Sequence, residues 1–316
     1  MKTVSVLIPT YNELSNVEPL SEAIITEFSK LTQYDYTITF IDNNSQDGTR
    51  EKLRELCKAN KKIRAILNAK NFGFNNSPYH GITQVGGDCV ILMCADFQDP
   101  VDMIPKLLQK WEEGYKIVSA IKTTSKENKF VRFIRTCYYR LIKNLSEVEQ
   151  IEHFTGFGLY DASFVQVLKD LHDPTPFLRG IVAEFGFKRI EIPYEQQLRR
   201  AGKSKFNFFS LYDVAMLSFT SYTKIGLRLA TFIGGVMAFV STVIAIFYLV
   251  FKLLYWDKFS AGVAPIVIGI YFLGSIQLIF LGLIGEYILS MNKRIMNRPL
   301  VIEEERINFE EQKDEV

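Results

Sequence analysis

Short apolar runs recur along the first part of the chain, and each ends in a polar segment. The four clearest runs are TVSVLI at 3–8, YTITFI at 36–41, KIRAIL at 62–67 and DCVILM at 88–93. Their β-branched residues and short lengths predict buried parallel strands. Between the first two runs, Val17, Leu20, Ile24 and Phe28 recur at helical spacing. Strands that alternate with helices predict a doubly wound, Rossmann-like α/β domain over residues 1–205.

Two much longer apolar runs follow, at 229–251 and 261–285, and neither contains a charged residue. Each exceeds the roughly 20 residues that a helix needs to cross a bilayer. Buried core helices are the alternative, but uncharged runs of this length favour membrane spans. The pattern predicts a two-helix transmembrane hairpin within residues 228–290, with helices at about 229–251 and 263–287.

Basic residues flank the predicted hairpin on one side. Lys224 and Arg228 precede the first run, and Lys293 and Arg294 follow the second. An even number of spans places both ends of the chain on one side of the membrane, and the positive-inside rule favours the cytoplasm. The remaining residues, 291–316, are rich in charge and are predicted to form a solvated cytoplasmic tail.

A third apolar pattern lies between the α/β domain and the hairpin, over residues 206–227. Phe208, Leu211, Phe219 and Tyr222 fall on one face of a helix. Such an amphipathic helix suits the membrane interface. The alternative is a helix that packs on its own domain or on a neighbouring subunit.

Composition narrows the function classes. The chain has 316 residues and a formal charge of +2, which gives no reason to expect nucleic acid as a partner. Its four cysteines form no C-x-x-C pair and its three histidines are scattered, so a zinc site is not indicated. Reduced thiols facing the cytosol are expected.

Polar loops follow all four predicted strands, at 9–13, 42–49, 68–75 and 94–100. Ligands of doubly wound sheets bind beyond the carboxyl ends of the strands, so the four loops should form one site. The alternative is four ordinary turns, which are also rich in Asp, Asn and Gly. In the last loop, Asp99 before Pro100 also suits the start of a helix.

The chemistry of these loops favours a cation and a diphosphate. The sequence has no P-loop and no G-x-G-x-x-G after its first strand. Carboxylates at strand ends suit Mg²⁺ or Mn²⁺, which is held by oxygens together with substrate phosphates. The segment 197–207 brings Arg199, Arg200, Lys203 and Lys205 around a glycine and could close over a diphosphate. Attraction of this segment to anionic lipid is the alternative reading.

Taken in order, these motifs resemble those of family 2 glycosyltransferases of the GT-A fold. The similarity is to the membrane-anchored polyprenyl-phosphate glycosyltransferases, which include dolichol-phosphate mannose synthases and bactoprenol glucosyltransferases. The matching elements are IPTYNE at 8–13, DNNSQDGT at 42–49, KNFGFN at 70–75, ADFQDP at 95–100, RRAGKSKFN at 199–207 and the two apolar runs.

The resemblance implies an inverting, metal-dependent hexosyltransferase. Such an enzyme transfers one sugar from a nucleoside diphosphate to polyprenyl (undecaprenyl) phosphate at the cytoplasmic face of the inner membrane. UDP-glucose is favoured as donor, and UDP-GlcNAc, UDP-galactose and GDP-mannose are left open. The product would supply cell-envelope glycan, as in modification of the lipopolysaccharide O-antigen. A homo-oligomer is left open.

The resemblance also implies roles for single residues. The nucleotide pocket would be lined by Pro9, Tyr11, Glu13, Asp42, Asn71 and Asp96. Asp96 and Gln98 would hold the metal. The diphosphate and the acceptor phosphate would contact Arg199, Arg200, Ser204 and Lys205. The catalytic set is then Asp96, Asp99, Arg199 and Lys205.

The chain departs from the family pattern in three places. DNNS at 42–45 replaces the more usual D-D-G-S, and Cys94 stands where the first carboxylate of a D-x-D motif is common. The position of a proposed catalytic base aligns with Gly156 or Phe157, which leaves Asp99, Asp161 and Glu184 as fallback candidates. A phosphate acceptor reaches the site largely ionised, because its second pKa is near 6, and needs no base.

Two other functions compete with this one. A processive polysaccharide synthase is disfavoured, because the chain has only two predicted spans and lacks a Q-x-x-R-W motif. A catalytically silent membrane scaffold that binds a nucleotide sugar is favoured by Cys94 and by the missing base. Transfer of another sugar, or to another acceptor, is also left open.

Overall fold

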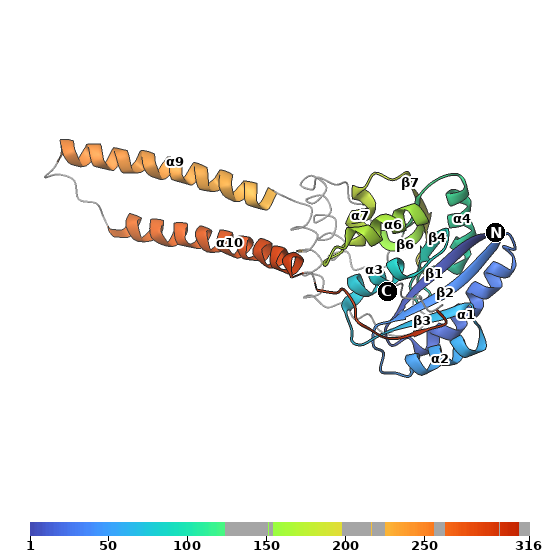
Figure 1. The fold of residues 1–316 in the computed structure, drawn as a ribbon. Helices are drawn as coiled ribbons and strands as arrows, with labels where there is room; N and C mark the ends of the chain where they lie inside the picture. Colours follow the sequence, from blue (N-terminus) through green and yellow to red (C-terminus); the bar gives the residue numbers. More distant parts are fainter. Residues whose placement is uncertain are drawn as a thin grey trace, which may run out of the picture.

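A computed structural model describes residues 1–123, 151, 154–197, 216, 225–255, 263–296 and 298–309. A mixed sheet forms the centre of the α/β domain, in the order β7-β5-β6-β4-β1-β2-β3-β8 (Figure 1). Its strands are β1 (Lys2–Thr10), β2 (Tyr34–Asp42), β3 (Ile63–Asn68), β4 (Cys89–Leu92), β5 (Ile117–Lys122), β6 (Phe154–Asp161), β7 (Arg189–Tyr194) and β8 (Glu303–Ile307).

The four strands predicted from the sequence are all present and mutually parallel. β1 pairs with β2 and β4, and β2 pairs with β3, in parallel register. β5 and β7 run in the same direction, whereas β6 and β8 are antiparallel to their neighbours. The predicted α/β sheet is therefore confirmed, with two reversed strands that the apolar runs did not reveal.

Helices cover both faces of this sheet. They are α1 (Leu14–Ser29), α2 (Thr49–Ala59), α3 (Gly73–Gln84), the short 3-10 helix η1 (Val101–Met103), α4 (Ile104–Glu112), α6 (Ala162–Leu171) and α7 (Leu178–Glu184). Side chains alternate across β1, so Val4, Val6 and Ile8 pack with α1, α2 and α4 on one face. Leu7 packs on the other face, in the cluster formed with α3, α6 and α7.

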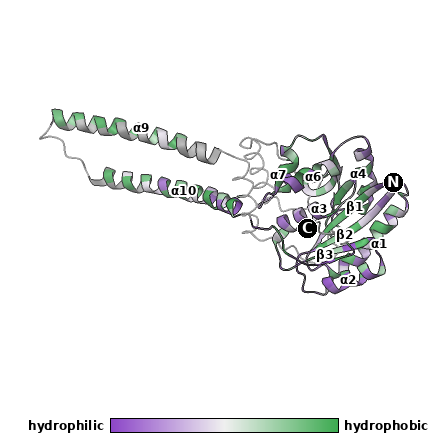
Figure 2. Ribbon diagram, in the orientation of Figure 1, coloured by the Kyte–Doolittle hydropathy of each residue, from purple (hydrophilic) through white to green (hydrophobic). Residues whose placement is uncertain are grey.

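Two long helices, α9 (Ile225–Leu254) and α10 (Val263–Ile295), extend away from the α/β domain, side by side (Figure 1). Gly234 and Met237 of α9 line a shallow groove together with Leu273 and Phe280 of α10. Hydrophobic residues recur along both helices (Figure 2). Within the described residues, Phe272–Ile295 is the one stretch whose length and hydropathy suit a membrane span. The two-span hairpin stays a prediction.

The charged tail differs from its prediction. Residues Glu303–Ile307 form β8, which pairs with β3, rather than a solvated end. An unpaired β3 would expose a row of backbone donors and acceptors at the sheet edge. The charges are also paired: Glu303 Oε1 lies 2.6 Å from His80 Nε2. Burial works to raise the pKa of Glu303, but hydrogen bonds from His80 and Arg306 outweigh it and lower this pKa to about 2.

Two predicted elements fall largely outside the described residues. They are the basic segment 197–207, of which Gln197 is described, and the amphipathic helix 206–227, of which only Met216 and the first residues of α9 are described.

Gly158 of β6 offers a test of the sheet packing. A Cβ atom at this position would lie 2.3 Å from the carbonyl oxygen of Val118 in β5. We expect Gly158→Ala to lower the free energy of unfolding by about 3 kcal/mol, because backbone atoms must move apart. Chemical denaturation measures the change. Gly86→Ala is the control, since its Cβ would meet no atom within 4 Å, and an equal loss in both variants would contradict the packing.

Candidate active site

The four polar loops meet at one edge of the sheet. In the parallel register, Thr10 lies opposite Asp42, Asp42 lies opposite Leu67, and Leu7 lies opposite Leu92. The carboxyl ends of β1, β2, β3 and β4 therefore adjoin one another. This arrangement agrees with the prediction of a single strand-end site rather than four separate turns.

Hydrogen bonds lock the first loop to the second. The backbone N–H of Asn12 donates to Ser45 Oγ at 2.7 Å, and Gln46 N–H donates to Asn12 Oδ1 at 2.8 Å. Asn12 has a φ of 56°, a left-handed conformation that asparagine tolerates better than most residues. Glu13 N–H donates to Thr49 Oγ1 at 3.0 Å. These contacts place Asn12 and Glu13 beside the loop that follows β2, while Pro9 lies in β1 opposite Ile41. That Pro9, Tyr11 and Glu13 line a nucleotide pocket stays a prediction.

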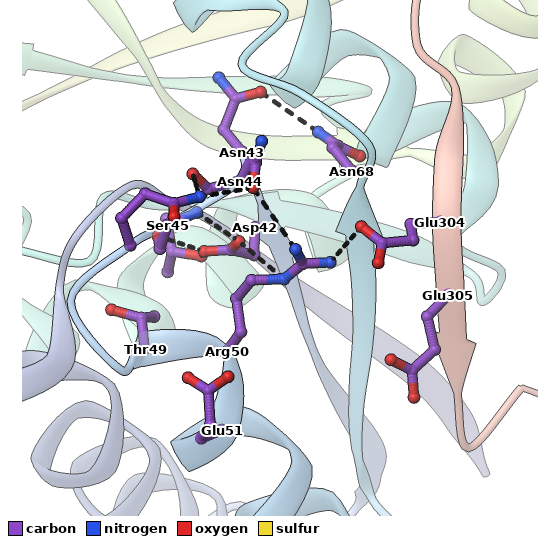
Figure 3. Close-up of polar contacts among 12 residues, drawn as sticks. Asp42, Asn43, Asn44, Ser45, Thr49, Arg50, Glu51, Asn68, Glu304 and Glu305 are labelled. Carbon is purple, nitrogen blue, oxygen red and sulfur yellow. Dashed lines mark hydrogen bonds and ion pairs between the residues drawn. The ribbon is translucent and has the colours of Figure 1, made fainter.

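Asp42 is fully buried and organises the second loop (Figure 3). Its carboxylate accepts hydrogen bonds from Ser45 N–H at 2.9 Å and from Ser45 Oγ at 2.5 Å. Arg50 Nε lies 3.9 Å from the same carboxylate. Burial raises the pKa of Asp42, although the hydrogen bonds from Ser45 and the charge of Arg50 oppose this shift. In this structure Asp42 shapes the loop, and its direct contact with a nucleotide stays a prediction.

A cluster of side-chain amides joins the second loop to the third. Asn43 Nδ2 donates to Asn71 Oδ1 at 2.8 Å and to the carbonyl oxygen of Gly73 at 3.3 Å. Asn43 Oδ1 accepts from Phe72 N–H at 2.8 Å and from Asn68 Nδ2 at 3.3 Å (Figure 3). Asn71 therefore lies close to the second loop, as predicted. Asn43, where the family pattern usually has an aspartate, supplies an N–H donor that a carboxylate lacks.

The fourth loop carries Asp96 and Asp99, and both are buried. Asp96 Oδ1 accepts from the backbone N–H of Gln98 at 3.1 Å, so the carboxylate of one predicted metal ligand contacts the backbone of the other. Asp99 accepts from Cys94 N–H and from the Tyr194 hydroxyl, each at 2.9 Å. Burial raises the pKa of Asp99. Asp99 thus braces the loop, so the prediction that it caps a helix is wrong, and η1 begins without a side-chain cap.

The other fallback bases lie away from this edge. Asp161 pairs with Cys89, the first residue of β4, which places it at the amino edge of the sheet. There it caps α6 and accepts from Trp111 Nε1 at 2.7 Å. Burial works to raise the pKa of Asp161, but hydrogen bonds from Ser163 and Trp111 outweigh it and lower the pKa. Glu184 is exposed at the end of α7, shortly before the amino end of β7. Neither carboxylate joins the strand-end loops.

Only the first residue of the predicted basic segment 197–207 is described, and it contacts the fourth loop. The Gln197 N–H donates to the carbonyl oxygen of Gln98 at 3.3 Å. Arg199, Arg200, Ser204 and Lys205 lie outside the described residues. The basic segment therefore starts beside the fourth loop.

The oxygen donors of the fourth loop suit a weakly held cation. The described part of the chain contains no group of three or more His, Cys, Asp or Glu side chains that could bind a metal. Asp96 with Gln98 matches the pattern of Mg²⁺, which takes one or two protein carboxylates and relies on substrate phosphates and water. The Cys94 thiol is a poor ligand for such a hard cation.

Sequence reasoning missed three residues that the structure places in this region: Arg50, Tyr194 and Asn43. Arg50 lies in the first turn of α2, and Tyr194 ends β7. Neither residue belongs to a loop that follows one of the first four strands, so its place in the sequence did not indicate that it would lie near the site. Asn43 did carry a signal, because it replaces an aspartate of the usual family pattern.

Comparisons with known proteins agree with this arrangement. Doubly wound α/β domains bind their ligands at the sheet edge where the carboxyl ends of the strands meet. The chain matches the family model "Glycosyl transferase family 2" over residues 5–168, and it belongs to that family. The resemblance predicted from the motifs is thereby confirmed.

The relatives align over nearly the whole chain. A Synechocystis protein described as an uncharacterized glycosyltransferase is 30% identical, over 95% of this chain and 94% of its own length. The SfII prophage-derived bactoprenol glucosyl transferase of Shigella flexneri is 29% identical, over 95% of this chain and 96% of its own length.

Among solved structures, mannosyl-3-phosphoglycerate synthase from Rubrobacter xylanophilus is 18% identical, with a TM-score of 0.47 over 68% of this chain and 71% of that chain.

The amide cluster can be tested with Asn43→Asp. A carboxylate at this position would face the oxygens of Asn71 and Gly73 without a proton to donate. We expect a loss of about 1–3 kcal/mol in the free energy of unfolding, together with faster hydrogen exchange in residues 71–75. Asn60→Asp is the matched control, because Asn60 uses the Oδ1 atom to accept from Lys62 N–H. Equal losses in both variants would contradict the role of the Asn43 donor.

Proposed function

We propose that the protein transfers one sugar from a nucleoside diphosphate to a polyprenyl phosphate at the cytoplasmic face of the membrane. Relatives named bactoprenol glucosyl transferases support this proposal, since they align with both the α/β domain and the long helices. Their name favours glucose, and UDP-glucose is the first donor to test.

One observation carries the proposal. The chain that leaves β7 contacts the fourth loop at Gln197, and the apolar helix α9 is the next described helix in the sequence. The site that holds Asp96 and the segment rich in Arg and Lys are therefore joined to the part of the molecule that suits a lipid environment. A water-soluble acceptor would require no such connection.

The long helices would anchor this site at the membrane. At 1.5 Å per residue, the 30 residues of α9 and the 33 residues of α10 are about 45 and 50 Å long. Both lengths exceed the roughly 30 Å of a bilayer's hydrocarbon core. We propose that both helices span the membrane, with the residues at 206–227 at its interface and the α/β domain in the cytoplasm.

The oxygen-bearing residues and the basic residues of the site would have different roles. Asp96 and Gln98 would hold a divalent cation, which would stabilise charge on the departing diphosphate. Arg199 and Lys205 would orient the phosphates of donor and acceptor. A phosphate monoester is largely ionised near neutral pH and attacks without a base, so the position of Asp161 and Glu184 at the other edge is compatible with transfer.

A silent scaffold is the second candidate. Two features favour it. Cys94 stands in place of a carboxylate, and the oxygens of Asp99 accept hydrogen bonds that brace the loop. A scaffold would bind a nucleotide sugar and transfer nothing.

A panel of donors separates these functions. The purified full-length protein would be incubated with undecaprenyl phosphate, Mg²⁺ or Mn²⁺, and radiolabelled UDP-glucose, UDP-GlcNAc, UDP-galactose or GDP-mannose. We expect labelled lipid with one donor, and loss of the label when a chelator removes the metal. Binding of a donor without labelled lipid across the panel would favour the scaffold.

Asp96→Ala tests the metal assignment. We expect transfer to fall by about a hundredfold or more, because charge on the leaving diphosphate loses its stabilising cation. Asp99→Ala should instead lower stability by about 1–3 kcal/mol, since Cys94 N–H and the Tyr194 hydroxyl lose their acceptor. Initial rates and thermal unfolding of both variants distinguish the roles. Wild-type activity in Asp96→Ala would sink the metal assignment.

A further inference from the structure

The C-terminal strand reaches the strand-end loops through its pairing with β3. Glu303 of β8 lies opposite Asn68, the last residue of β3, in the antiparallel register. The backbone N–H of Ala69 donates to the carbonyl oxygen of Ile302 at 2.9 Å, so the pairing continues into the third loop. A segment that follows the last long helix thus lies beside residues that follow the third strand.

Arg50 connects this strand to the second loop. Arg50 Nη2 lies 2.7 Å from Glu304 Oε2, while Nη1 donates to Asn44 Oδ1 at 3.4 Å and Nε lies 3.9 Å from Asp42 Oδ2. Figure 3 shows the Arg50 side chain between the Asp42 loop and Glu304 of β8. A planar guanidinium can contact several acceptors in fixed directions, which makes it suited to such a bridge.

Because Arg50 and Asp42 are buried, the contact of Arg50 with Glu304 matters for holding Arg50 beside Asp42. The Arg50 side chain is only 13% exposed and that of Asp42 is fully buried, whereas Glu304 is 53% exposed. Asp42 is the more distant partner of Arg50, so the 2.7 Å contact with Glu304 is the one that fixes the guanidinium. Removing that contact would free Arg50 to turn toward water. The buried Asp42 would then lose its nearby positive charge, which is costly for a carboxylate shielded from water.

The next pair along the same strand lacks this connection. Glu305 Oε2 lies 2.8 Å from Arg54 Nη2, and Arg54 also pairs with Glu51 at 3.5 Å. Arg54 lies one turn further along α2, where it contacts these two surface glutamates. Two adjacent glutamates of β8 therefore make similar ion pairs with α2, but only one pair reaches the loop after β2.

We propose that Arg50 is a positioning residue of the nucleotide-sugar site and that Glu304 of the C-terminal strand holds it in place. Through this contact β8 becomes a part of the donor site, although it follows the membrane helices in sequence. The inference rests on the proposed function, because it assumes that the loop containing Asp42 and Asn44 binds the donor nucleotide.

The test compares Glu304→Gln with Glu305→Gln in the full chain, purified in detergent. Binding of UDP-glucose with Mg²⁺ is measured by calorimetry, with GDP-mannose in parallel, and steady-state transfer gives KM and kcat. We expect Glu304→Gln to weaken donor binding and raise KM by about threefold to fivefold, with kcat changed little. Glu305→Gln should leave both constants within about twofold of wild type. Thermal unfolding should shift equally in the two variants.

A double-mutant cycle distinguishes positioning from a general loosening of the strand. Arg50→Gln should weaken donor binding at least as much as Glu304→Gln, and the double variant should bind no worse than Arg50→Gln alone. Additive effects, or wild-type affinity in Glu304→Gln, would overturn the inference while the proposed function stands. A wild-type protein that binds neither donor would overturn the proposed function and this inference with it.

Discussion

The common direction of β1, β2, β3 and β4 is the constraint on which the rest of the site depends. Because the four strands are parallel, their carboxyl ends meet at one edge, and the loops that leave them must share a small region. Hydrogen bonds between the loops then convert proximity into a defined shape. Ser45, held by Asp42 and contacted by Asn12, is the point at which the first two loops become one unit.

Buried polar groups give this unit its rigidity. Asp42, Asn43 and Asn68 are all nearly or fully buried. Asp42 accepts from Ser45 of its own loop and from Thr10 at the end of β1, whereas Asn43 accepts from Asn68 and from Phe72 of the third loop. A buried polar group that lost its partner would cost about 1–3 kcal/mol, so these hydrogen bonds hold the loops in their observed arrangement. The proposed cation site differs, because Asp96 and Gln98 alone would form an incomplete set of ligands and would need the substrate to complete it.

The sequence was informative where a pattern reflected backbone geometry. Apolar runs such as 3–8 and 88–93 located strands, and the polar residues after them located loops that meet at one edge of the sheet, since strand direction dictates where loops emerge. It was misleading where one residue type serves two purposes. Asp99 and Asp161 are carboxylates that a motif reading treats as candidates for catalysis. Only the sheet register shows that Asp161 is at the far edge, and only tertiary contacts show that Asp99 braces a loop. The strand at 303–307 escaped notice for a similar reason, because its run of charge resembles a solvated segment until its partners are known.

The position of β8 has a consequence for how the chain is made. β3 ends at Asn68, but its outer neighbour in the sheet is not synthesised until residues 303–307, after both long helices. The edge of β3 therefore stays unpaired until both long helices have been synthesised, and an open edge of this kind is prone to wrong pairing. The sheet is complete only once residues 303–307 have been made, so a chain that stops before them lacks this strand even though every residue of the first four strand-end loops is present.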